Sequence, residues 1–214
     1  AGAAAIAEAL KINKTLKFLD LQENRIGDAG AQAIGKALAT ENHRNPRNKI
    51  EISLCSNQIG DVGAEAIAKA LANNKTLENI DLQENQIGDA GAAAIAEAMK
   101  GNEKIKLINL YHNHIGDAGA QAIAKMIETN TTLAELYISD NRITDAGATA
   151  FLEALEKNNT LEFLDIFDKH HLSAAVKNKF KEIEDAKNNL HKKQNPQTRK
   201  KQISSLFNKY YFKF

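Results

Sequence analysis

The chain has 214 residues, of which 43% are hydrophobic and 26% charged, and its formal net charge is +1. No run of 18 apolar residues occurs, which excludes a transmembrane helix, and the single cysteine, Cys55, excludes a disulfide within the chain. The charge is unevenly divided, because residues 1–172 carry a net charge of −7 and residues 173–214 carry +8.

The chain opens on a helical pattern with no strand before it. Ala1-Gly2 aligns with Ala29-Gly30, where the same two residues open a helix. We therefore expect the first unit to be truncated, either because the sequence is a fragment of a longer protein or because its N-terminal cap is missing. No signal peptide is seen, but a truncated chain gives no information on targeting.

One phrase then recurs along the chain. Ile-Gly-Asp-Ala-Gly-Ala begins at Ile26, Ile87 and Ile115, and near copies begin at Ile59 and Ile143. The interval is 28 residues for the last three steps and 33 for the first, which places a five-residue insertion within 41–49. A fixed period of this length predicts a repeat architecture. An asparagine stands two residues before each isoleucine: Asn24, Asn57, Asn85, Asn113 and Asn141.

Each period combines two kinds of spacing. Apolar residues two apart, such as Leu19 and Leu21, precede the asparagine and predict a short strand with one buried face. Lys49 interrupts this pattern in the second unit, and Lys169 replaces the asparagine in the sixth. After the asparagine the apolar spacing is helical, as in Ala29, Ala33, Ile34, Ala37 and Leu38. Aspartates that can cap the free amides of these helices stand just before them: Asp28, Asp61, Asp89, Asp117 and Asp145.

The pattern Leu16-x-x-Leu19-x-Leu21-x-x-Asn24-x-Ile26 with an alanine-rich helix resembles the ribonuclease-inhibitor-like class of leucine-rich repeats. Similar repeats occur in NOD-like receptors and in Ran GTPase-activating proteins. The resemblance covers residues 1–172 and implies a right-handed α/β solenoid of about six repeats. It implies parallel strands on a concave face, helices on a convex face, and asparagine amides that bond the backbone of the tight loops.

Residues 173–214 form a different, basic region. Ser173 is a good helix cap, and the apolar face after it predicts a helix that covers the last repeat: Val176, Phe180, Ile183 and Leu190. Residues 197–214 predict a basic amphipathic helix, with lysines interleaved among apolar residues at helical spacing. This helix has four alternative roles: packing on the domain, packing on a symmetry mate, binding a partner groove, or lying on an anionic membrane.

No residue set points to catalysis, a metal or a cofactor. In His112-Asn113-His114 the asparagine is the repeat asparagine, and His170-His171 lies in the degenerate sixth loop. Cys55 has Gln22 and Gln83, not histidine, at the matching positions of neighbouring units, so a thiol nucleophile is not expected. The sequence therefore predicts a non-enzyme. Four Asn-x-Thr sequons recur where each helix turns into the next strand, and we attribute them to left-handed backbone there: Asn13, Asn74, Asn130 and Asn158.

Strand alternation predicts the side chains on the concave face. Five of the six aromatic residues before residue 180 fall there, and core packing gives no reason for that preference. The C-terminal half is expected to bind a protein partner through an aromatic patch: Leu107, Tyr111, His112, Tyr137, Phe163 and Phe167. The N-terminal half is acidic and is expected to attract a basic partner and repel nucleic acid: Asp20, Glu51 and Asp81.

The leading interpretation is a protein-binding scaffold. The tail, rich in Lys, Asn, Ile and Phe, adds the hypothesis of a bacterial virulence effector that binds host proteins. Localisation is then cytoplasmic, or secreted into a host cell. The alternative is a GTPase-activating protein, which the resemblance to the Ran activators suggests.

Overall fold

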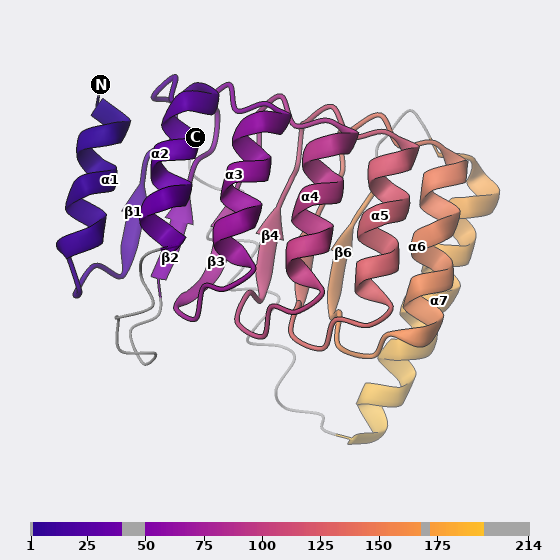
Figure 1. Ribbon diagram of the computed structural model, residues 1–214. Helices are drawn as coiled ribbons and strands as arrows, with labels where there is room; N and C mark the ends of the chain where they lie inside the picture. The colour runs from indigo at the N-terminus through magenta and orange to yellow at the C-terminus, as the bar shows by residue number, and fades with distance from the viewer. Residues whose placement is uncertain (1, 40–49, 168–171, 195–214) are drawn as a thin grey trace.

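The molecule is a row of strand-loop-helix units (Figure 1). The computed structural model describes residues 2–39, 50–167 and 172–194, so the expected insertion at 41–49 lies outside the described residues. Within these ranges the strands are β1 (Phe18–Asp20), β2 (Ile50–Ser53), β3 (Leu77–Asp81), β4 (Leu107–Asn109), β5 (Glu135–Tyr137) and β6 (Phe163–Asp165). The helices there are α1 (Gly2–Ile12), α2 (Gly27–Ala39), α3 (Asp61–Leu71), α4 (Asp89–Met99), α5 (Asp117–Ile127), α6 (Asp145–Lys157) and α7 (Ala174–Gln194).

The strands form one parallel sheet in chain order, β1 to β6, across the described part of the chain. The register advances by one repeat at each step, so that Asn79 pairs with Leu107, Leu107 with Glu135, and Glu135 with Phe163. In Figure 1 the helices stand side by side along one face of this sheet. The arrangement confirms the predicted α/β solenoid.

The core lies between the sheet and the helices. Ile80, Ile108 and Leu136 occupy one row of the sheet and are each at most 1% exposed. On the helix side, Ile123 and its equivalents face inward, and in α6 the larger Phe151 fills the same position without exposure. Each unit thus adds one layer of apolar side chains to a continuous core, which the leucine spacing predicted.

The repeat asparagines bridge neighbouring loops, as the resemblance implied. Asn85 Nδ2 donates to the carbonyl of Leu54 in the preceding unit and to two carbonyls of its own loop, at 3.0 Å each. Asn85 Oδ1 accepts from the backbone N–H groups of Asn57 and Ile59, at 3.1 and 2.9 Å. Turns that leave sheet pairing would otherwise bury unpaired backbone groups. The same inter-unit bridge recurs at Asn57, Asn113 and Asn141.

The repeat aspartates cap helices, but the expectation that each caps its own helix is wrong. Asp61 is the first residue of α3, and its Oδ1 accepts from the N–H groups of Gly88 and Gly91, at 2.7 and 2.9 Å, at the start of α4. A Cβ on Gly91 would lie 2.8 Å from that carboxylate oxygen, which explains the glycine. The helices stand beside one another, so each aspartate reaches its neighbour's free amides. Asp28, Asp89, Asp117 and Asp145 do the same for the following helix.

The explanation given for the sequon asparagines is also wrong. The left-handed residues of the described chain include Glu84 and His112 in the strand-to-helix loops, but none of the sequon asparagines. Asn130 instead spans two units: Nδ2 donates to the carbonyl of Met99 at 2.7 Å, and Oδ1 accepts from the N–H groups of Thr132 and Leu133. Side-chain hydrogen bonding therefore explains the recurrence. Buried amides of this kind, already bonded, are not free acceptors of a glycan: Asn74, Asn130 and Asn158.

Helix α7 packs beside α6 at the end of the row (Figure 1). Ser173 Oγ accepts from the N–H of Val176 at 3.3 Å, and Val176 and Phe180 are buried in the main apolar cluster. Ile183 is partly buried against the same cluster, whereas the side chain of Leu190 and all of residues 197–214 lie outside the described residues. None of the helices described is long and apolar enough to cross a bilayer.

Candidate functional site

The sheet face opposite the helices is the face predicted to be concave, and we call it the open face. In each strand, the residues before and after the buried residue point to the open face. In β3 these are Asn79 and Asp81, on either side of the buried Ile80. The parallel register stacks these residues into columns. The first column is Phe18, Glu51, Asn79, Leu107, Glu135 and Phe163. The second is Asp20, Ser53, Asp81, Asn109, Tyr137 and Asp165.

A third column follows just beyond the strand ends. It consists of Gln22, Cys55, Gln83, Tyr111, Ser139 and Phe167. No lysine or arginine occupies any of the three columns, and five of their positions are acidic. The open face is therefore negative along its whole length, including the aromatic half, which carries Glu135 and Asp165. The acidity therefore extends beyond the N-terminal half, where it was expected.

The predicted aromatic residues make separate contacts. The rings of Tyr137 and Phe163 lie 5.1 Å apart between centroids, and Phe163 is 40% exposed. Phe167 is 43% exposed and meets Phe180 of α7 edge to face at 5.6 Å. Tyr111 lies against His112 at 5.9 Å. The structure thus joins Tyr137 with Phe163 and brings α7 to the edge of the same half of the face.

Two of the predicted binding residues differ from expectation in their surroundings. Leu107 is only 9% exposed, so it supports the face from below and offers little area to a partner. His112 is exposed, and its Nδ1 lies 2.6 Å from Asp140 Oδ2 in the next loop. Tyr137 Oη donates to Glu135 Oε2 at 3.1 Å, which fixes the ring beside Phe163.

Burial raises the pKa of acidic residues on the open face. It raises the pKa of Asp81 from the ordinary value of 3.8 to about 6, and the negative charges of Asp20 and Glu84 add to the rise. The hydrogen bond from the Gln83 N–H, at 3.0 Å, opposes it. Burial likewise raises the pKa of Glu135 above its usual value. A cationic group brought to this face would relieve these penalties.

A polar network that the residue pattern did not predict connects the two halves of the face. Gln83 is its centre: Nε2 donates to Cys55 Sγ at 3.1 Å, and Oε1 accepts from Asn109 Nδ2 at 2.9 Å. Cys55 also lies 3.3 Å from Ser56 Oγ. Burial raises the pKa of the Cys55 thiol, which favours the protonated form and argues against a nucleophilic role.

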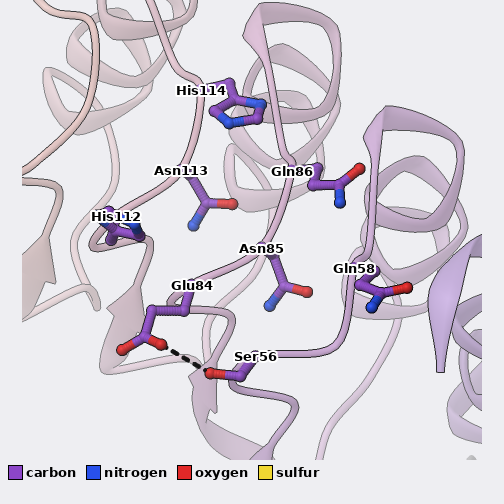
Figure 2. A pocket seen from close by; sticks show the side chains of 8 residues that line it. All are labelled: Ser56, Gln58, Glu84, Asn85, Gln86, His112, Asn113 and His114. Carbon is purple, nitrogen blue, oxygen red and sulfur yellow. Dashed lines mark hydrogen bonds between the residues drawn. The ribbon is translucent and has the colours of Figure 1, made fainter. Parts of the chain in front are cut away.

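A pocket of about 380 Å³ lies along the strand-to-helix loops (Figure 2). Ser56 and Glu84 line it and are joined by a hydrogen bond from Ser56 Oγ to Glu84 Oε2 at 2.9 Å, while Asn85 and Asn113 project from successive loops. The carboxamides of both asparagines already bond the backbone. No group of three or more His, Cys, Asp or Glu side chains that could hold a metal occurs among the residues described. Both histidines of His112-Asn113-His114 line the pocket, and His170-His171 lies outside the described residues.

Comparison with known proteins places this geometry in a family. A model of the leucine-rich repeat matches residues 13–35, 51–68, 73–96, 101–124 and 129–152. A search of curated proteins found no match.

Two solved structures have a similar fold. One is the actin-binding site 2 of leiomodin-1, with 19% identity and a TM-score of 0.63, covering 78% of this chain and 94% of that one. The other is the C-terminal domain of tropomodulin from Caenorhabditis elegans, with 12% identity and a TM-score of 0.58, covering 91% and 98%. At these identities the likeness concerns the fold alone.

Proposed function

The chain belongs to the leucine-rich-repeat family, and we propose that it is a non-enzymatic scaffold that binds a protein partner through the open face of its sheet. One observation carries the proposal: the Tyr137–Phe163 pair stands on the open face, where Phe163 keeps 40% of its surface in water. A phenylalanine placed there contributes nothing to the core. It becomes stabilising when a partner covers it.

The charge of the open face indicates the kind of partner. The three columns hold five acidic residues and no basic one, and they flank the aromatic pair on both sides. Such a face attracts cations and repels phosphate backbones. We therefore assign the partner a basic surface with an apolar patch, in which aromatic contacts supply affinity and the acids supply orientation.

The test is capture of partners from a eukaryotic lysate, with identification by mass spectrometry. Recovery of a host protein by the intact chain also tests the effector hypothesis, which rests on the composition of the tail. Purified actin is one defined probe, because a protein of similar fold is an actin-binding site. The GTPase-activating alternative rests on the resemblance to the Ran activators, and GTP hydrolysis rates of candidate GTPases with and without the chain separate it from the scaffold.

The mapping to the face is tested by substitution. Phe163→Ala is expected to weaken binding of the captured partner by more than about 1 kcal/mol, because exposed aromatics at the centre of an interface dominate its energy. Val62→Ala is the matched control, since Val62 is 53% exposed but lies on helix α3, on the opposite side of the molecule. Equal affinities for the two variants would contradict the assignment to the open face.

A further inference from the structure

We propose that residues 197–214 bind in cis to the open face, as an internal ligand that a partner must displace. This inference rests on the proposed function, because it describes regulation of the same face. Of the four roles that the sequence left open for the tail, it selects packing on the domain, and it names the open face as the surface.

Charge is the first argument. The open face has no lysine or arginine in its three columns, whereas residues 197–214 carry five basic residues and no acidic one: Arg199, Lys200, Lys201, Lys209 and Lys213. A covalently attached segment competes at a high effective concentration, so modest complementarity is enough to fill the face. The exposed Phe163 and Phe167 supply an apolar surface for the apolar side of the tail.

Position is the second argument. Asp145 caps the start of α7 at Ser173, just as the other repeat aspartates cap their neighbours, so α7 begins level with the other helices. It has 21 residues, against 11 in α3 to α5, and a rise of about 1.5 Å per residue carries its end roughly 15 Å past theirs. Figure 1 shows this overhang at the lower end of α7. Helix α7 therefore ends beyond the edge of the sheet at which strand β6 begins.

Length is the third argument. Eighteen residues in the helix that the sequence predicts would span about 27 Å. Six strands at a spacing of about 4.8 Å give a sheet about 24 Å across in the described part of the chain. Because the tail must first recross the overhang of α7, a fully helical tail covers only the nearest strands. Eighteen residues extended at about 3.3 Å each span about 59 Å, so a tail that is at least partly extended reaches the far strands.

The mixture of basic and apolar residues along the tail matches the mixture of acidic and aromatic residues along the face. Three basic residues at 199–201 precede Ile203, Leu206 and Phe207, and aromatic residues also surround Lys209 and Lys213. The aromatic half of the face in turn carries Glu135 and Asp165. An anionic membrane or a second copy of the chain could also bind a basic amphipathic tail, but neither accounts for this agreement with the face of its own chain.

Zero-length carbodiimide cross-linking of the intact chain tests the proposal, with peptide mapping of the monomer band. We expect links from Lys209 or Lys213 to Glu51 or Glu84 on the acidic half. Equal mixing with nitrogen-15-labelled chain distinguishes links within one chain from links between chains. Leu206→Asp with Phe207→Asp keeps every reactive lysine. We expect it to lower the yield by at least about tenfold, because each of the two apolar side chains contributes about that factor when it is buried.

Three results would overturn the inference: no links from the tail, links only to carboxylates of the helices such as Glu97 of α4, or links only between chains. The same would follow if the double substitution left the yield unchanged. Failure here is separable from failure of the proposed function. Partner binding that depends on Phe163 in the absence of tail links supports the scaffold without the internal ligand, whereas tail links without such a partner support the reverse.

Discussion

Asn85 offers a sharp test of how the repeats hold together. Its carboxamide bonds five backbone groups in two units, at 2.9 to 3.1 Å, and the residue is 6% exposed. Asn85→Ala leaves these groups without a partner, and each buried unpaired group costs about 1 kcal/mol or more. Because water can reach some of them, we expect a loss of about 3 to 5 kcal/mol in the free energy of unfolding.

Asn24→Ala is the matched control for this substitution. Asn24 fills the same repeat position in the first unit, but it is exposed and donates to only two carbonyls, those of Leu21 and Gln22. We expect a loss of about 1 kcal/mol there. Urea denaturation followed by circular dichroism measures both variants, since the chain has no tryptophan to report by fluorescence. Equal losses at the two positions would refute the inter-unit bridge as a source of stability.

Two further predictions concern the face and the helix caps. The pKa of Asp81 in the folded state, about 6, exceeds its ordinary value of 3.8. The contribution of Asp81 to the free energy of unfolding is therefore greatest below about pH 4 and is lost as the pH rises through 6. Asp81→Asn is expected to raise the free energy of unfolding by about 3 kcal/mol at pH 7, because each pKa unit corresponds to about 1.4 kcal/mol, and to have little effect at pH 4; a gain independent of pH would contradict the reasoning. Gly91→Ala puts a Cβ 2.8 Å from Asp61 Oδ1 and is expected to lower the free energy of unfolding by about 2 kcal/mol. Gly101→Ala, with nothing within 4 Å, is expected to change it by less than about 0.5 kcal/mol, and similar melting temperatures would count against the capping account.

The open face and its proposed internal ligand together suggest how binding is controlled. A face with five acids in its columns and an aromatic pair in which Phe163 is exposed attracts many basic surfaces. An attached basic segment competes with all of these surfaces and lowers their apparent affinity for the face. Only a partner with well-matched apolar contacts then displaces the segment. Removal of residues 197–214 is therefore expected to broaden binding as well as to strengthen it.

Several features of the fold could be predicted from the residues alone. The apolar spacing around Leu19 and Leu21 and the recurring Asn24 position determine the strand, the loop and the core layer of each unit. Strand alternation then places Phe163 and Asp81 on the open face, because successive side chains point to opposite sides. These are local properties of one repeat, and the period carries them from one unit to the next.

The contacts that cross from one unit to its neighbour could not be predicted from the residues, because they depend on how the units stack. Asp61 caps the following helix and not its own, and Asn130 ties a helix end to the next strand instead of adopting a left-handed backbone. Gln83 bonds Cys55 and Asn109 in the two adjacent units. The sequence gives the order and the period of the units, but hydrogen bonds depend on distances of about 3 Å between atoms far apart in the chain. Those distances are set only when the units stack.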